Sequence, residues 1–518
     1  MAQLEIKSLT RSFGNTRVSM HTLDQAHLSR LPSTVVRPGY DRSKVRAGIA
    51  HIGVGGFHRA HEAIYTDRAL ARPGQEGWGI CGINLLPQDA PMAAAMKKQN
   101  GLYTVSEMAP DGSHVSRVVE CMVEYLYAPD SPEAVLARLS HPDIRIVSLT
   151  ITEGGYLIGE HGTFNLEHPT VVHDLAHPGS PQGVFGYLVE ALARRRQAGI
   201  KPFTVMSCDN LRHNGAQTRR AVVAFAKARE PELGAWIERE VAFPNGMVDR
   251  ITPATDNAAR QKLRELTQVD DGAPVICEDF IQWVLEDHFP NGRPEWDAVG
   301  VMFTQDVSPY EEAKIRLLNA THTMLSYPAY LSGLRKVDDA LHEPLFFGYL
   351  RGFLDHDAGV WLQSLPGLDI PAYKDKLLER FGNRAVGDQL ARLCMDGGSK
   401  IPGFVLPTLH ALFANNRPYH RIAFLLAAYD RYLKGTDEKG TPHTIVEPNA
   451  RHLLEPVIQS DSPLTLVKLK EVVGAQVPQH QGFIDLYLQL RKQMDEQGVV
   501  STLESLDASR ESPPSARA

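Results

Sequence analysis

The fold of this chain is decided by the stretch Ala47-Gly48-Ile49-Ala50-His51-Ile52-Gly53-Val54-Gly55-Gly56-Phe57-His58-Arg59. Its first six residues form a short apolar run that predicts a buried β-strand, and a helical pattern follows the glycines as far as Leu70. A second buried strand is expected over residues 78–83. The order of strand, glycine turn, helix and strand is typical of a βαβ unit, and it predicts an α/β domain.

Gly53 and Gly55 give part of the dinucleotide-binding pattern G-x-G-x-x-G. The first glycine permits a tight turn, and the second lets the backbone approach a pyrophosphate at a helix N-terminus. His58 stands where the third glycine is expected, so a plain strand-to-helix turn is the alternative interpretation. Asp89, just past the second strand, could bind a ribose 2′-hydroxyl, although it lies further on than the usual ~20 residues. Because an acid repels a 2′-phosphate, the pattern favours NAD over NADP.

The rest of the chain changes in character near residue 305. Before that point, further buried strands are expected at 144–150 and 203–207, with helices at 182–199 and 214–240. Beyond it, long amphipathic patterns occur at 309–334, 344–355, 372–396, 404–415 and 420–434. We therefore expect an α/β Rossmann-type N-terminal domain and a mainly α-helical C-terminal domain. The predicted regions are a peripheral lead-in at 1–45, the nucleotide-binding domain at 46–305, the helical domain at 306–503 and a disordered tail at 504–518.

Composition restricts the classes of partner and location. The 518 residues include 54 basic and 61 acidic side chains and carry a net charge of -7, which argues against nucleic acid or an anionic membrane as partner. No run approaches the ~20 apolar residues that span a bilayer, and the N-terminus lacks a signal-peptide layout. The five cysteines are widely spaced and odd in number, which favours a reducing, cytoplasmic location. Without an H-E-x-x-H or C-x-x-C pattern, we expect no bound metal.

An amine, an amide and an imidazole lie close together where the helical region begins. At about 100° per residue, Lys314, Asn319 and His322 fall within an arc of about 140° on an α-helix, among leucines. They could form a catalytic cluster. Alternatively, Glu311 and Lys314 could be an ordinary surface pair, with Asn319 and His322 as tolerated polar residues.

The start of this helix also has recognisable signals. Ser308 suits the N-cap and Pro309 the first helical position, and Glu311 would complete a capping box. Tyr310 and Lys314 fit the Y-x-x-x-K pair of short-chain dehydrogenases. We reject that role for Tyr310, because the glycine pattern differs, the chain is far longer and no serine lies at the expected distance upstream.

Five motifs, taken in order, resemble the polyol-specific long-chain dehydrogenases, with the mannitol-oxidising members nearest. They are His51-Ile52-Gly53-Val54-Gly55-Gly56-Phe57-His58-Arg59-Ala60-His61, Ser148-Leu149-Thr150-Ile151-Thr152-Glu153-Gly154-Gly155-Tyr156, Val205-Met206-Ser207-Cys208-Asp209-Asn210, Phe243-Pro244-Asn245-Gly246-Met247-Val248-Asp249-Arg250-Ile251-Thr252-Pro253 and the Lys314 cluster. The resemblance covers about residues 40 to 500. It implies an NAD-binding domain, a helical domain, a site in the cleft between them and catalysis without a metal.

The resemblance also implies roles for individual residues. Lys314 would be the general base, Asn210 and Asn319 donors to the reacting oxygen, and His322 a substrate-orienting group. Further from the chemistry, it implies polyol contacts from Asp249, Arg392 and Lys400, a proton relay through Glu311, and cofactor contacts from Gly53, Gly55, Gly56, Phe57 and Asp89. The chain departs from the family at Gln88, which replaces an acid often found before Asp89.

The implied reaction is oxidation of a polyol secondary alcohol to a ketose. D-mannitol to D-fructose is the favoured pair, with D-arabinitol and fructuronate as alternatives. The family includes monomers, so a monomeric chain is compatible with the resemblance. Two rivals stay open: a zinc alcohol dehydrogenase, and a catalytically silent NAD-binding sensor, against which the complete Lys314 set argues.

Overall fold

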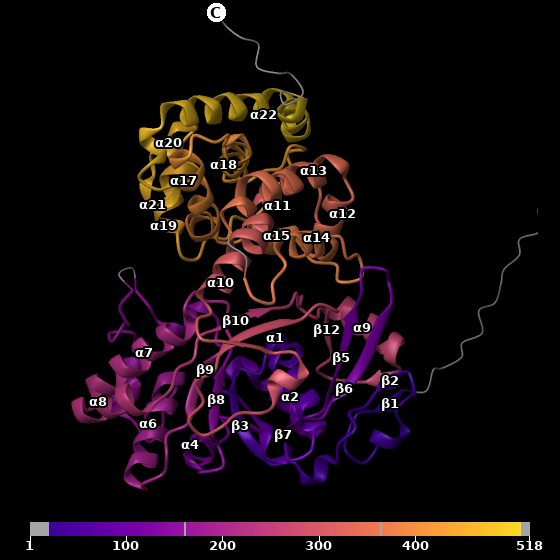
Figure 1. Cartoon of the computed structure of the whole chain (residues 1–518), viewed down its shortest axis with the longest axis vertical. Helices are drawn as coiled ribbons and strands as arrows, with labels where there is room; N and C mark the ends of the chain where they lie inside the picture. Colours follow the sequence, from indigo (N-terminus) through magenta and orange to yellow (C-terminus); the bar gives the residue numbers. More distant parts are fainter. Residues whose placement is uncertain (1–19, 160–161, 363–364, 509–518) are drawn as a thin grey trace, which may run out of the picture.

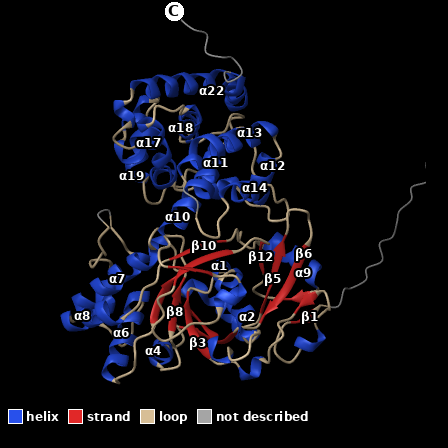
Figure 2. Cartoon of the chain, viewed as in Figure 1, coloured by secondary structure: helices blue, strands red, loops and turns tan. Residues whose placement is uncertain are grey.

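The computed structural model describes residues 20–159, 162–362 and 365–508. Figure 1 shows an α/β part below and a helical part above, with helix α10 (Ser308–Lys314) at the junction. Figure 2 shows the strands in the lower part, and within the described residues the last of them is β14 (Met302–Thr304). The predicted fold class is confirmed: an α/β Rossmann-type domain precedes a mainly helical one.

A five-stranded parallel sheet forms the centre of the α/β part. Its order is β7 (Met122–Tyr127), β4 (Gly79–Asn84), β3 (Ala47–Ile52), β8 (Ile146–Leu149) and β9 (Thr204–Ser207). The inner strands are buried at every residue, as expected where helices cover both faces of a parallel sheet. Strand β3 lies between β4 and β8, so the chain winds outward from it in both directions. That switch point is where open α/β sheets bind ligands, beyond the carboxyl ends of the strands.

Helices pack on both faces of this sheet. On one face, α4 (Pro132–Ser140), α6 (Val184–Gln197) and α7 (Asn214–Arg229) share an apolar cluster with Ile52. On the other, α2 (Glu62–Leu70) packs with Ile49. The single helix predicted at 214–240 is wrong: Pro231 begins a second helix, α8 (Pro231–Glu240). Glu230 is extended, with φ −155°, because a residue before proline is disfavoured in the helical region.

Smaller sheets extend the α/β part. Strand β10 (Gly246–Asp249) pairs with β13 (Gln282–Glu286), which also pairs with β14. A four-stranded sheet runs β12 (Val275–Glu278), β5 (Tyr103–Met108), β6 (His114–Val119) and β2 (Val35–Val36). Strand β2 belongs to the region expected as a lead-in, and β1 (His21–Thr22) pairs with β11 (Val269–Asp270). The described part of that region, from residue 20, is thus built into the sheets, and residues 1–19 lie outside the description.

The helical part surrounds α11 (Ala320–Leu331) and α18 (His420–Tyr432). Helix α18 is buried at every residue from Arg421 to Asp430, which places it at the centre of the largest apolar cluster. Helix α22 (Gln481–Ala508) runs past 504, where the disordered tail was expected to begin, and the rest of that tail lies outside the described residues. Within the described ranges, no helix has the length and apolarity to cross a membrane.

Candidate active site

Lys314 joins the two parts of the molecule through its side chain. It is the last residue of α10 and is 8% exposed, and its Nζ donates hydrogen bonds of 2.6 Å to Asn210 Oδ1 and to the carbonyl oxygen of Val248. Asn210 follows β9, and Val248 lies in β10. Burial lowers the pKa of Lys314, and the positive charge of Arg380 acts in the same direction. A neutral amine has two N–H donors, which these two bonds use, and one lone pair, which they leave free.

The segment after Lys314 is not the regular α-helix that the sequence predicts. Residues Ile315–Asn319 form a π-helix, labelled η7, between α10 and α11. A π turn is wider than an α turn and often marks a functional site. Positions on a 100° helical wheel therefore do not place Asn319 and His322 relative to Lys314. The wider turn ends at Asn319, whose side chain lines the same cavity as Lys314.

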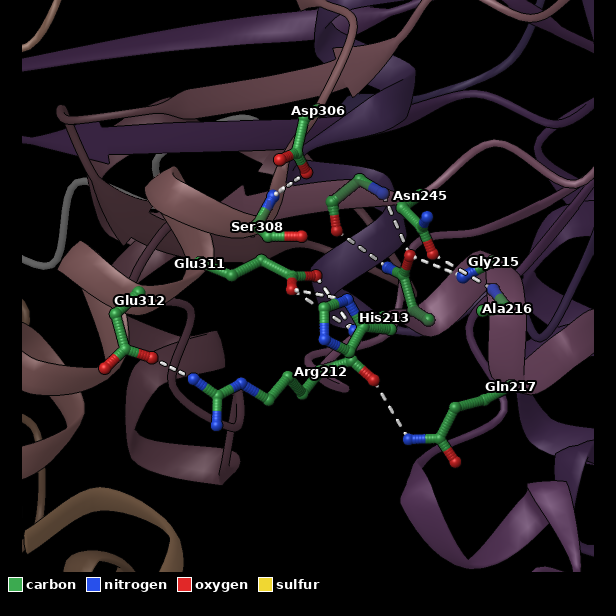
Figure 3. A network of polar contacts seen from close by, with 12 residues as sticks. Arg212, His213, Gly215, Ala216, Gln217, Asn245, Asp306, Ser308, Glu311 and Glu312 are labelled. Carbon is green, nitrogen blue, oxygen red and sulfur yellow. Dashed lines mark hydrogen bonds and ion pairs between the residues drawn. The ribbon is translucent and has the colours of Figure 1, made fainter. Parts of the chain in front are cut away.

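The predicted capping box at the start of α10 is wrong. Val307 occupies the N-cap position without a side-chain bond, and the Ser308 N–H donates to Asp306 Oδ1 over 2.9 Å. The Glu311 carboxylate instead accepts hydrogen bonds of 3.0 and 3.2 Å from the backbone N–H of His213 (Figure 3). Glu311 thus makes a contact between the two parts of the molecule. Because its carboxylate is occupied there, it does not cap its own helix.

A cavity of about 140 Å³ brings four predicted residues together. Asn210, Glu311, Lys314 and Asn319 all line it, with β10 forming another wall. A larger hollow of about 710 Å³ lies beside β7 and α3 (Ala90–Lys98), and none of the predicted site residues lines it. The smaller cavity is the better candidate for catalysis, since its buried lysine has a lowered pKa and lies between amide groups.

Asp249 lies at the end of β10 and is 4% exposed. Arg380, from α14 (Ile370–Phe381), donates a hydrogen bond of 2.9 Å to each of its carboxylate oxygens and also bonds to Glu278. Tyr373 donates a longer bond of 3.4 Å to the same group. Sequence reasoning missed Arg380, because an arginine on an amphipathic helix is typical of a solvated face. The structure makes it the group that holds Asp249 in place.

His322, Arg392 and Lys400 lie near one another, but none of them lines this cavity. The His322 ring stacks on Phe381 at 3.9 Å between centroids, and its buried Nε2 has no hydrogen-bond partner among the described residues. Burial, with the nearby cationic side chains, holds the pKa of His322 well below its usual value, so the ring is neutral. Arg392 bonds to Asp388 over 2.9 Å, and Lys400 Nζ donates to a backbone carbonyl of α15 (Leu390–Cys394) over 3.1 Å.

The glycine turn after β3 has the geometry that a dinucleotide requires. Gly53 has φ +97°, and a Cβ there would lie 2.1 Å from the carbonyl oxygen of Thr150, so only glycine fits. At Gly55 and Gly56 a Cβ would meet nothing nearer than 3.8 Å. The open space above these two glycines fits the close backbone approach of a pyrophosphate at the start of α1 (Gly56–Ala60).

His58 takes the place of the third glycine and is fully buried. Its ring stacks on His51 at 3.4 Å, and its Nδ1 lies 3.2 Å from Glu62 Oε2. His51 in turn reaches the carbonyl oxygen of Gly53 at 3.2 Å and Thr150 Oγ1 at 2.9 Å. Within the described residues, His51, His58 and Glu62 are the one set of such side chains close enough to share a metal ion, but their contacts with one another are of hydrogen-bond length. These three side chains therefore stabilise the turn at Gly53, which His51 contacts directly.

Other predicted cofactor residues lie around this turn. Asp89 is in the short helix η4 (Pro87–Asp89), is half-buried, and accepts a hydrogen bond of 3.2 Å from the Leu86 N–H. Phe57 is half-buried on α1. Sequence reasoning missed Asn84, the last residue of β4, whose Oδ1 accepts the Val54 N–H over 3.2 Å. One sequence feature could have identified Asn84: it is a polar residue at the carboxyl end of an apolar strand.

Asp209 positions the loop that carries Asn210. Its carboxylate accepts backbone N–H bonds of 2.9 Å from Ile151 and 3.0 Å from Thr152, and the Tyr156 hydroxyl donates to it over 2.7 Å. The loops after β8 and β9 are thereby tied together. Asp209 lies in a motif quoted above, but the sequence alone did not show that it holds its neighbour.

The comparisons with known proteins agree with this architecture. The family profile described as the mannitol dehydrogenase Rossmann domain matches residues 47–298. The one described as the mannitol dehydrogenase C-terminal domain matches residues 306–494. The chain belongs to the mannitol dehydrogenase family. The resemblance read from the sequence is thus confirmed, and the protein is a dehydrogenase of this family.

Relatives of this mannitol dehydrogenase family member cover nearly the whole chain. It is 43% identical to a polyol:NADP oxidoreductase of Gluconobacter oxydans, over 92% of this chain and 98% of that protein. It is 39% identical to a mannitol 2-dehydrogenase of Phaeosphaeria nodorum, over 93% of this chain and 85% of that protein.

Among solved structures, mannitol 2-dehydrogenase of Pseudomonas fluorescens, in a ternary complex with NAD and D-mannitol, aligns with a TM-score of 0.86 at 44% identity. That alignment covers 94% of this chain and 99% of the other. A substrate-free D-sorbitol dehydrogenase aligns with the same TM-score at 42% identity, over 93% of this chain and 100% of the other.

Proposed function

We propose that this protein oxidises a secondary alcohol of a polyol to a ketose with NAD, D-mannitol to D-fructose being the favoured pair, and catalyses the reverse reduction. One observation carries the proposal: the buried Lys314 amine bonds to Asn210 inside the cavity where the two parts of the molecule meet. The relative crystallised with NAD and D-mannitol supports the choice of cofactor and substrate.

Lys314 acts as the general base towards the reacting hydroxyl. A lysine amine ordinarily titrates near ~10.4, too high for a base at neutral pH. Burial lowers the pKa of Lys314, so a larger fraction is neutral. With Asn210 and Val248 accepting its two N–H bonds, the lone pair is available for the substrate proton. In the direction of ketose reduction, the protonated amine donates that proton to the carbonyl oxygen.

The two asparagines stabilise the reacting oxygen. Since Asn210 accepts from Lys314 through Oδ1, its Nδ2 hydrogens are left to donate to the oxygen as negative charge develops there. Asn319, which lines the same cavity, supplies a second amide. The unpartnered Nε2 of His322 is suited to a neighbouring substrate hydroxyl.

The chain's residues fit an NAD cofactor. The positive φ of Gly53 and the open space at Gly55 and Gly56 suit a pyrophosphate, and Phe57 lies on the helix that follows. When bound, the nicotinamide supplies the acceptor for the substrate hydride. Asp89 favours the free 2′-hydroxyl of NAD. The polyol:NADP oxidoreductase relative makes NADP the alternative to test.

Asp249, Arg392 and Lys400 would bind the remainder of the substrate. Asp249 is suited to accept from polyol hydroxyls while Arg380 holds it. Arg392 and Lys400 would accommodate either a neutral polyol or a carboxylate, which keeps D-arabinitol and fructuronate as alternative substrates. Sorbitol is included in the test because a D-sorbitol dehydrogenase aligns over 93% of this chain.

The test is a substrate panel followed at the NADH absorbance band. Mannitol, arabinitol and sorbitol are offered with NAD and with NADP, and fructose and fructuronate with the reduced cofactors. We expect the highest kcat/KM for D-mannitol with NAD and for fructose with NADH. A preference for fructuronate would replace the polyol with a sugar acid. Cofactor binding without turnover on any substrate would favour the silent sensor.

A further inference from the structure

Glu311 lies between the catalytic cavity, which it lines, and the half-exposed His213. It lines the cavity together with Lys314, which follows it by one helical turn on α10. Its side chain is 5% exposed, and one carboxylate oxygen lies 3.5 Å from Nδ1 of His213, whose side chain is 47% exposed. Figure 3 shows the His213 ring beside the Glu311 carboxylate. Buried base, buried acid and half-exposed imidazole thus follow one another from the cavity outward.

We infer that His213 is the solvent-side end of the proton path that begins at Lys314 and passes through Glu311. The inference rests on the proposed function, since it concerns the proton that polyol oxidation releases. It assigns a role to a residue in the loop after β9, on the α/β side of the junction.

Each proton transfer along this path balances without electron transfer. Lys314 Nζ, protonated by the substrate hydroxyl, gives a proton to the Glu311 carboxylate through water, for which the cavity of about 140 Å³ has room. The resulting carboxylic acid gives it to Nδ1 of neutral His213. The imidazolium then releases its Nε2 proton to bulk water or buffer, and tautomer exchange of the half-exposed ring with solvent frees Nδ1 for the next turnover. Ketose reduction runs the same transfers backwards. Burial raises the pKa of Glu311, which suits it to hold a proton in passage.

The backbone holds His213 against Glu311. His213 has φ +51° and ψ 47°, a left-handed conformation that is uncommon outside glycine and asparagine and that concentrates at functional sites. Its own N–H donates to both Glu311 oxygens, so the imidazole is tethered beside the carboxylate. The charged groups around the pair are Arg212, which bonds to Glu312, together with Asp306 and Glu286.

A purely structural role for His213, as a contact between the two parts of the molecule, is the competing explanation. Two variants separate the explanations. His213→Asn keeps the backbone N–H and tolerates the left-handed conformation, so it removes the imidazole alone. Glu312→Gln is the matched control, because it removes the neighbouring Arg212–Glu312 contact between the same two parts and leaves His213 and Glu311 in place.

The experiment measures proton release in the first turnover with NAD and D-mannitol, by stopped flow with a pH indicator in dilute buffer. For His213→Asn we expect release to slow by roughly tenfold, below the range for a direct general base because water can substitute in part. Added imidazole should restore the rate, while KM and NADH affinity stay at wild-type values. Glu312→Gln should release protons like the wild type.

Three outcomes would overturn the inference. They are wild-type release in His213→Asn, slow release that imidazole does not restore, and equally slow release in Glu312→Gln. Combining His213→Asn with Glu311→Gln adds a further test: on one path the double variant is no slower than Glu311→Gln alone, whereas additive losses would contradict a shared path. If wild-type enzyme turns over no polyol, the proposed function itself has failed, and the inference fails with it.

Discussion

The two halves of the candidate site are built in opposite ways. On the nucleotide side, the turn at Gly53 is held by backbone and buried side chains, including Asn84 and the stacked pair His51 and His58. On the catalytic side, the cavity is lined by polar side chains that can exchange hydrogen-bond partners, the Lys314 amine and the Asn210 and Asn319 amides. Buried atoms without a partner occur on both sides among the described residues, at Nε2 of His322 and at Nε2 of His58.

This difference has a physical explanation. A pyrophosphate can be bound by backbone groups, which requires a fixed turn and open space rather than particular side chains. Proton transfer requires a group that exchanges hydrogen-bond partners, so its side chains must be buried without being fully paired. Substitutions on the nucleotide side should therefore lower cofactor affinity, whereas substitutions on the catalytic side should lower kcat.

The largest effect is expected for Lys314→Ala. Removal of the base should lower kcat by at least about 1,000-fold, within the range measured for general acid–base groups. NADH affinity, followed by fluorescence titration, should survive, because the lysine lies outside the glycine turn. Normal turnover in this variant would contradict the proposed mechanism, and partial rescue by a small primary amine would support it.

Asn319→Ala should have the next largest effect. Loss of one donor to the developing oxyanion typically costs about 100-fold in kcat. Because the cavity side chain contributes nothing to the nucleotide turn, NADH affinity should not change. Steady-state kinetics with D-mannitol provide the measurement. A fall in NADH affinity with an unchanged kcat would contradict the assignment of Asn319 to the catalytic side.

The nucleotide half is tested by Gly53→Ala against Gly55→Ala. A Cβ at position 53 meets the Thr150 carbonyl at 2.1 Å with φ +97°, so this variant should lose stability, by about 1–3 kcal/mol from backbone strain before the clash is counted. At position 55 the space is open, so Tm should hold while NADH affinity falls. Equal melting temperatures for the two variants would contradict the assignment of a structural role to Gly53 and a cofactor-binding role to Gly55.

The smallest effect is a shift in pH dependence. The base must be neutral, so kcat/KM for oxidation should rise with pH and level off below the ordinary lysine pKa of about 10.4. The negative charge of Glu311 raises the pKa of Lys314, against the lowering by burial. Glu311→Gln should therefore move the rising limb to lower pH, even though it also slows proton release. A shift to higher pH would show that Glu311 does not act on the lysine through its charge.

The sequence predicts the nucleotide half better than the catalytic half, for a physical reason. The strand at 47–52 and the turn at Gly53 depend on residues next to one another in the chain, so the sequence pattern predicts them. The structure has the strand at those residues. The π-helix over Ile315–Asn319 and the contact of Glu311 with His213 depend on packing between distant segments. Local rules accordingly give a capping box and a regular helix there, both of which are wrong.

Arg380 shows the same limit. Its role depends on Asp249 and Glu278, more than 100 residues away along the chain. No local pattern marks such a residue. The roles carried over from the family for Asn210, Asp249 and His322 stay predictions until variants of them are assayed.

The most direct test of the central claim, that an amine rather than a metal removes the proton, is NADH formation from D-mannitol by enzyme dialysed against a strong chelator. The buried His51, His58 and Glu62 set makes this control necessary. The lysine mechanism predicts an undiminished rate in chelated wild-type enzyme and a rate at least about 1,000-fold lower in chelated Lys314→Ala. Loss of wild-type activity on chelation, with recovery on adding zinc, would contradict it.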